Sequence, residues 1–179
     1  MINVRIQPMY IPGGDPEGMN EPAATWRWPG LIGGVMTTDD RTVSPARSKT
    51  YQMVRTDSTM SVNPFRGAVA WWASRQTYTT TTAATDRGMV AGVYLNAVTK
   101  GNITLVQTKG NMASVKGIDA LTASPTTAGL FVIPSATAAK ADVLAAGTAA
   151  TYPPLGRTVG TLNTGDNTFA VELDVPEVL

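Results

Sequence analysis

The chain has 179 residues, of which 43% are hydrophobic and 15% are charged, with a formal net charge of +1. That length suits one domain with its own core, and the charges are scattered, which excludes the clustered Lys and Arg that attract nucleic acid or anionic lipid. Cys and His are absent, which excludes disulfides, thiolate zinc sites and the commonest general base.

The first residues, Met1–Pro8, do not read as a targeting signal, because no cationic start is followed by a continuous apolar run. No run in the chain approaches the roughly 20 apolar residues that a membrane helix needs. We therefore expect no membrane partner, and we expect synthesis and assembly in a cytoplasm.

Residues 1–48 differ in composition from the rest, since proline and glycine interrupt them repeatedly between Pro8 and Pro45. Each proline removes a backbone donor and restricts the preceding residue, so no helix of useful length is expected. The segment nevertheless carries aromatic residues, in which disordered tails are usually poor. The composition predicts an extended arm that packs on its own domain or wraps a neighbouring subunit or partner, and both alternatives stay open. The adjacent Asp39 and Asp40 are expected in a solvated turn or helix cap, not in a metal site.

From Lys49 onward the pattern becomes that of short strands. Thr50–Thr56 alternates apolar and polar residues and Gly67–Ser74 is an apolar run, so both are expected to be strands. Because neighbours in an extended chain point to opposite faces, Trp71 and Trp72 cannot both enter the same core. One is expected to fill the core. The other is expected to face solvent, another strand, the arm or another molecule.

The tetrapeptide Thr-Lys-Gly-Asn occurs twice, at Thr99–Asn102 and at Thr108–Asn111. Each copy places Gly beside Asn, the residues that enter positive φ at least cost. Short apolar runs lie before, between and after the two copies. This pattern predicts an antiparallel meander with a turn at each copy, which we take as the central sheet.

After a loop at Ile118–Pro125, strands are expected at Gly129–Pro134, Leu155–Leu162 and Phe169–Val175. The Ala-rich stretch Ala136–Ala146 is compatible with a short helix, a strand or coil. Seven to nine short strands with turns about every ten residues predict an all-β domain over residues 49–179, a small antiparallel barrel or sandwich that follows the arm of residues 1–48. One face of the last strand would hold Phe169, Val171, Leu173 and Val175.

No sequence motif of an enzyme is present: there is no phosphate-binding loop, no dinucleotide fingerprint and no nucleophile elbow. A pair of carboxylates, as in glycoside hydrolysis, is the remaining possibility. Nearly all candidates sit beside turn residues, where Asp is expected for local backbone bonding. We therefore expect no enzyme, no cofactor and no metal site. The candidate carboxylates are Asp86, Asp119, Asp142, Asp166 and Glu172.

The succession of motifs from Thr50 to Leu179 resembles the capsid decoration (cement, or head-stabilising) proteins of tailed double-stranded DNA bacteriophages. The residues that carry the resemblance are Gly88-Met-Val-Ala-Gly-Val-Tyr-Leu-Asn-Ala-Val-Thr-Lys-Gly-Asn, Leu105-Val-Gln-Thr-Lys-Gly-Asn, Val132-Ile-Pro-Ser-Ala-Thr and Gly156-Arg-Thr-Val-Gly-Thr-Leu. The resemblance implies a β-domain without catalytic residues. It also implies a homo-oligomer, most often a trimer, on the outer surface of the virion.

On this reading the partners are the major capsid protein and further copies of the chain, with no nucleic acid and no membrane. The alternative is a head-fibre or tail-associated module that binds a carbohydrate or receptor through exposed aromatic residues. The side chains expected to make capsid or inter-subunit contacts are Tyr10, Trp26, Trp28, Leu31, Trp71 and Trp72.

Overall fold

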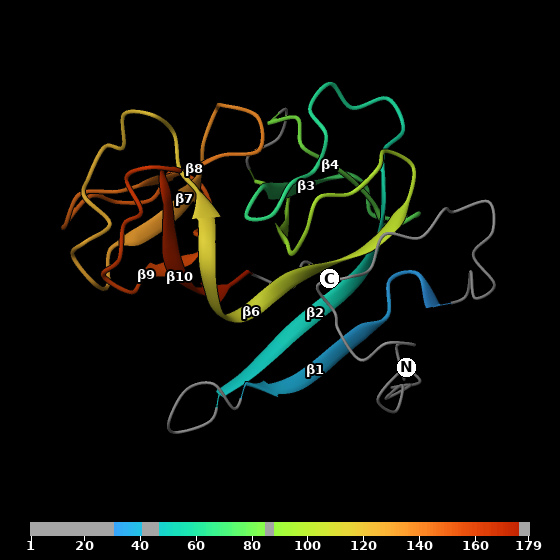
Figure 1. The fold of residues 1–179 in the computed structure, drawn as a ribbon, viewed down its shortest axis with the longest axis horizontal. Helices are drawn as coiled ribbons and strands as arrows, with labels where there is room; N and C mark the ends of the chain where they lie inside the picture. Colours follow the sequence, from blue (N-terminus) through green and yellow to red (C-terminus); the bar gives the residue numbers. More distant parts are fainter. Residues whose placement is uncertain (1–30, 41–46, 85–87, 176–179) are drawn as a thin grey trace.

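The computed structural model describes residues 31–40, 47–84 and 88–175, which form ten β-strands and no α-helix (Figure 1). The predicted all-β class is confirmed, with ten strands in place of seven to nine. The strands are β1 (Val35–Asp40), β2 (Arg47–Thr56), β3 (Val69–Ser74), β4 (Thr79–Thr81), β5 (Val90–Tyr94), β6 (Ile103–Lys116), β7 (Phe131–Pro134), β8 (Ala141–Val143), β9 (Gly156–Thr158) and β10 (Thr168–Asp174).

Five strands close into a barrel in the order β2–β4–β3–β5–β6, because β2 also pairs with β6. Neighbours in the barrel are antiparallel except β2 and β4, which run parallel over a short contact of Arg55 and Thr56 with Thr79 and Thr80. The sequence left a barrel and a sandwich as alternatives, and the structure shows a closed barrel. Within the described residues there is no helix of the length and hydropathy that a membrane span requires.

A second group of strands continues from the far half of β6 in the order β6–β10–β9–β7–β8. It curls back on itself, since Gly117 at the end of β6 forms a parallel bridge with Ala141 in β8. Figure 1 shows β6 as the long curved strand that passes from the barrel into this group. In β10 the predicted apolar face is confirmed, because Phe169, Val171, Leu173 and Val175 are all buried.

The second Thr-Lys-Gly-Asn copy is not a turn, contrary to the sequence prediction. Thr99–Asn102 does form the turn that joins β5 to β6, but Thr108–Asn111 lies inside the uninterrupted β6. Both glycines have positive φ, +83° at Gly101 and +88° at Gly110. The positive φ at Gly110 bends the strand instead of reversing it, so one strand serves both halves of the molecule.

Gln107 stabilises this bend from inside the fold. Its side chain is 1% exposed, and its amide Nε2 donates to the backbone oxygens of Lys109, Gly110 and Asn111, each at 3.1 Å. The same three residues pair with β10, and the amide adds a donor to their carbonyls at the bend, where buried carbonyls need donors. The register of β2 against β6 shifts beside the same point, between Thr50 and Tyr51.

One hydrophobic cluster runs through both halves, from Met53 and Trp71 in the barrel to Val132 and Phe169 in the second group of strands. A smaller cluster lies on the opposite faces of β2, β3, β5 and β6, and Ala139 from the loop before β8 joins it. Tyr94 in that cluster is fully buried and its hydroxyl donates to Thr80 Oγ1 at 2.9 Å. Burial raises the pKa of Tyr94 above that of an ordinary tyrosine.

Two further expectations change with the structure. The sheet begins at Val35, within the segment assigned to the arm, and Asp39 and Asp40 end β1 instead of forming a turn or helix cap. Asp39 pairs with Ser48 and Asp40 pairs with Arg47, because β2 begins at Arg47, ahead of the predicted start at Thr50, and forms an antiparallel ribbon with β1. Ala136–Ala146, left open between helix, strand and coil, contains the short strand β8.

Candidate interaction surface

Trp71 and Trp72 separate as their alternation in β3 requires. Trp71 is 0% exposed and belongs to the larger cluster, whereas Trp72 is half-buried and packs against the smaller one. The indole Nε1 of Trp71 has no hydrogen-bond partner among the described residues. Trp71 is therefore a core residue, and Trp72 is the member of the pair that a neighbouring molecule could reach.

The ring of Tyr78 lies beside Trp72, with the centroids 6.3 Å apart and the planes at 69°. Tyr78 is 38% exposed and has a φ of 49° in the hairpin between β3 and β4. Gly33 lies directly against this ring, because a Cβ built on Gly33 would collide with it. We call Gly33, Trp72 and Tyr78 the aromatic corner.

The turn before β1 holds the start of the described chain at this corner. Gly33 N donates to Met53 O at 2.8 Å, and Gly34 N donates to Leu31 O at 2.9 Å. Leu31 is half-buried and packs against the larger cluster. The described chain therefore begins beside a partly exposed aromatic pair.

The second feature is the outer edge of β1, which has no neighbouring strand on that side among the described residues. Gly34 O accepts from Met53 N at 2.9 Å, and bonded and non-bonded pairs alternate along an antiparallel ribbon. Met36 and Thr38 therefore bond to β2, and Val35 and Thr37 direct their N–H and C=O groups outward. The hydroxyls of Thr37 and Thr50, 3.3 Å apart, fit the closer, non-bonded type of pair. We call these outward groups the open edge.

The six residues predicted to make contacts are thus placed unevenly. Trp72 lies at the aromatic corner, Leu31 lies two residues before Gly33 and packs against the larger cluster, and Trp71 is buried in the core. Sequence reasoning missed Tyr78 and Gly33, because the contact between them joins β-turns far apart in the chain and leaves no local pattern. The other three, Tyr10, Trp26 and Trp28, lie outside the described residues.

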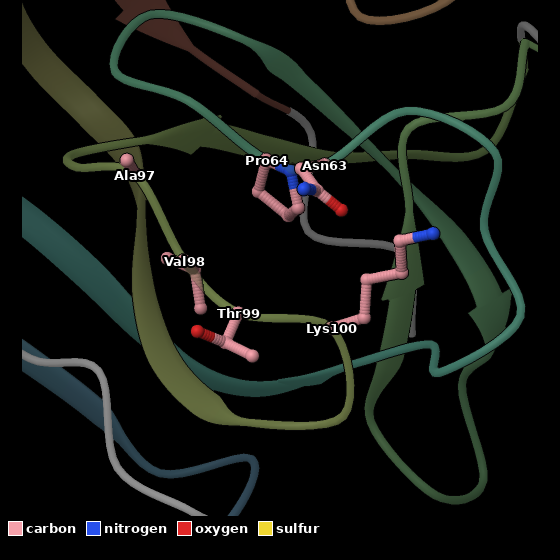
Figure 2. Close-up of a pocket in the computed structure, with 6 residues that line it drawn as sticks. All are labelled: Asn63, Pro64, Ala97, Val98, Thr99 and Lys100. Carbon is pink, nitrogen blue, oxygen red and sulfur yellow. The ribbon is translucent and has the colours of Figure 1, made fainter.

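A hollow of about 470 Å³ lies at the end of the barrel between two loops (Figure 2). The loop before β3 contributes Asn63 and Pro64, and the turn before β6 contributes Ala97–Lys100. The loops are joined by a hydrogen bond from Val98 N to Pro64 O at 3.1 Å. No carboxylate lines the hollow, and it opens widely to solvent, so it lacks the paired acids and the enclosure that hydrolysis uses.

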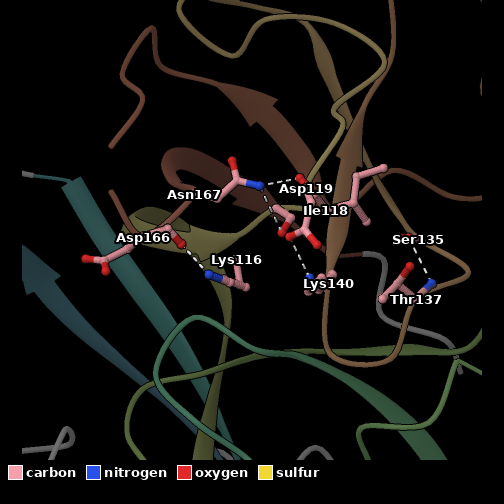
Figure 3. Close-up of polar contacts among 9 residues, drawn as sticks. Lys116, Ile118, Asp119, Ser135, Thr137, Lys140, Asp166 and Asn167 are labelled. Atoms are coloured by element: carbon pink, nitrogen blue, oxygen red, sulfur yellow. Dashed lines mark hydrogen bonds and ion pairs between the residues drawn. The ribbon is translucent and has the colours of Figure 1, made fainter. Parts of the chain in front are cut away.

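Two of the candidate carboxylates bond to neighbouring loops and strands. Asp119 forms an ion pair with Lys140 at 2.9 Å, and this hydrogen bond and charge lower the pKa of Asp119 below its usual range. Asp142 accepts from Thr122 N at 2.9 Å and from Thr122 Oγ1 at 2.7 Å. Figure 3 shows the first of these pairs beside the contact of Lys116 Nζ with the main-chain oxygen of Asp166.

These contacts hold the loops of the second group of strands to one another. In the same region Asn167 Nδ2 donates to the main-chain oxygen of Ile118 (Figure 3), and Asn163 Nδ2 donates to Asp166 at 3.3 Å. Glu172 is half-buried in β10, and Asp86 lies outside the described residues. The arrangement can order loops, which is the local role expected of Asp beside turns.

Within residues 31–40, 47–84 and 88–175, no group of three or more acidic side chains comes close enough to hold a metal ion. The described surface does offer an open strand edge and a partly exposed aromatic corner, both close in sequence to Leu31, where the described chain begins. Comparison with protein-family models, with curated proteins and with solved structures gave no match.

Proposed function

We propose that the chain is a virion structural protein that binds the outer surface of a phage capsid and stabilises the shell by bridging neighbouring major capsid subunits. The observation that supports the proposal is that the open edge and the aromatic corner adjoin: Gly33 lies against Tyr78, and β1 begins two residues later at Val35. The motifs between Thr50 and Leu179 that resemble decoration proteins add to it.

The physical demands of this role match these features. A protein that ties shell subunits together needs many contacts repeated by symmetry, which add through effective concentration. It needs an unpaired strand edge or an extended segment that pairs with a partner. A contact of about 800 Å² per subunit is the size of a standard interface. A homo-oligomer, with a trimer favoured over a dimer, would multiply such contacts on each particle.

Removal of residues 1–30 tests the proposal. We expect the shortened chain to keep its strand content and its cooperative unfolding, because Leu31 and β1, which pack on the barrel, remain. We expect it to lose at least about nine-tenths of its occupancy on purified capsids, since contacts repeated over a shell are lost together. Sedimentation of capsids with bound protein measures the occupancy. Full occupancy by the shortened chain would contradict the assigned role of the leading segment.

The aromatic corner also favours a second candidate, a head-fibre or tail-associated module that binds a carbohydrate or receptor. Partly exposed rings such as Trp72 and Tyr78 are suited to stacking on sugar faces. A glycan-binding screen with the purified protein separates the two candidates. Saturable glycan binding that Trp72→Ala abolishes, together with no attachment to capsids, would favour this second function.

A further inference from the structure

The first four residues of the open edge lack the devices that usually protect an edge strand, and its charges are confined to the end, at Asp39 and Asp40. Native proteins cover such edges, shorten them, or place lysine or proline on them. Val35–Thr38 contains no charge and no proline, and Val35 is 51% exposed. By the same alternation the outward backbone groups belong to the β-branched Val35 and Thr37 and to Asp39, and β1 is six residues long. Such an edge is suited to the addition of one further strand.

The leading segment contains a stretch of the same length with a strand pattern. In Ile2–Gln7 the apolar residues Ile2, Val4 and Ile6 alternate with Asn3, Arg5 and Gln7, and Pro8 ends the run. Strict alternation over four to eight residues is typical of a half-buried strand, and its end at a proline sets the length. Arg5 would also bring a positive charge to a strand that ends in Asp39 and Asp40.

We propose that Ile2–Gln7 of one copy adds as a strand to the open edge of β1 in a neighbouring copy, so that the protein assembles by exchange of its leading segments. This proposal deepens the proposed function by naming the partner of the edge.

The connection between the two elements is long enough to reach a neighbouring copy. Residues 8–30 separate Ile2–Gln7 from Leu31 and contain Pro8, Pro12, Pro16, Pro22 and Pro29. Prolines favour an extended chain, and at about 3.1 Å per residue this connection, which also contains Gly13, Gly14, Gly18 and Gly30, would span up to roughly 70 Å when extended. A connection of that length, joined to the described chain at Leu31, is long enough to bring Ile2–Gln7 to the open edge of a neighbouring copy.

Disulfide trapping tests the exchange against a clean background, because the chain has no cysteine. One tagged chain carries Val4→Cys, another carries Thr37→Cys, and the two are mixed and oxidised with diamide, both free and on capsids. We expect a heterodisulfide between the two tags, about ten-fold more abundant than with Asn20→Cys in place of Val4→Cys, because strand addition raises the local concentration of the thiols. A heterodisulfide no more abundant than with the Asn20→Cys control overturns the exchange.

Two cis outcomes would overturn the exchange as well. A chain carrying both Val4→Cys and Thr37→Cys should give linked oligomers, and a monomer with an internal disulfide would show that the segment returns to its own edge. A chain carrying Trp26→Cys and Thr37→Cys tests whether Thr25–Trp28 of the same chain occupies the edge. An internal disulfide in this variant would also overturn the exchange. If the protein attaches to capsids but the disulfide between copies does not form, the strand exchange is wrong and the proposed function stands. If the disulfide between copies forms but the protein does not attach to capsids, the proposed function is wrong and the strand exchange stands.

Proline provides a second test that needs no cysteine. The N–H of Thr37 points away from β2, so Thr37→Pro removes an edge donor and spares the β1–β2 ladder. We expect Thr37→Pro, and separately deletion of Ile2–Gln7, to weaken self-association at least about ten-fold, as loss of strand pairing requires, while Thr37→Val does not. Sedimentation velocity measures the association, and thermal melts check that each variant folds. Unchanged association in both the proline variant and the deletion overturns the proposal.

Discussion

Replacement of Trp71 by alanine is expected to lower the free energy of unfolding by about 3–5 kcal/mol. The side chain is 0% exposed and belongs to the cluster that joins the barrel to the second group of strands, so its loss leaves a large cavity. Urea unfolding followed by far-UV circular dichroism measures the effect without relying on tryptophan fluorescence.

Trp71→Phe is the matched control for this result. The buried indole Nε1 has no hydrogen-bond partner, so the phenyl ring removes an unsatisfied polar group while it loses some volume. We expect a cost of only about 1–2 kcal/mol, because the two effects oppose each other. A loss as large as that of the alanine variant would show that the indole N–H is bonded in solution.

Trp72→Ala should behave differently from Trp71→Ala. Trp72 is half-buried and its ring contact is with Tyr78, so we expect a stability loss of roughly 1–2 kcal/mol and a clear loss of capsid attachment. Equal stability losses for the two variants, with attachment unchanged in both, would contradict the assignment of one tryptophan to the core and the other to an interface.

The second large effect is expected at Gly110, the glycine of the second Thr-Lys-Gly-Asn copy. Its φ is +88°, and a Cβ added there would lie 2.6 Å from the backbone oxygen of Ser48. Gly110→Ala therefore combines about 1–2 kcal/mol of left-handed strain with about 1–3 kcal/mol for displacing packed backbone. We expect a loss of about 3 kcal/mol or more in urea unfolding, since both terms act at once.

Gly101, in the first copy, is the matched control. Its φ is +83°, nearly that of Gly110, but the added Cβ would meet nothing closer than Ser58 Cβ at 3.6 Å. Gly101→Ala should therefore cost only the conformational strain, about 1–2 kcal/mol. If the two alanine variants lose the same stability, the close approach of β2 to the bend in β6 is not what makes Gly110 necessary.

These twin tetrapeptides show where local sequence stops being informative. Thr99–Asn102 and Thr108–Asn111 are identical in sequence, and both glycines adopt positive φ, as their composition predicts. One reverses the chain and the other bends a continuous strand, because Gln107 bonds the carbonyls of the second copy and β10 pairs with the strand beyond it. Gln107 is adjacent in sequence, but the pairing with β10 involves residues more than 50 positions away, which no local pattern contains.

The alternating residues of β10 and the opposite placement of Trp71 and Trp72 followed from the sequence, because side-chain direction along an extended chain has a period of two. The aromatic corner did not follow, since Tyr78 meets Gly33 only after β3, β4 and β2 have come together. The open edge of β1 was also missed, because the prolines around it pointed to an arm and its pairing with β2 is a long-range event.

The order of apolar and turn residues thus determined by itself the all-β class, and the composition excluded cysteine and histidine chemistry. Only the tertiary structure decided that the strands close into a barrel, that β6 is shared between two groups of strands, and which edge is left open. The reason is physical: alternation and turn propensity act over a few neighbouring residues, whereas strand order and closure depend on hydrogen bonds between segments that are distant in sequence.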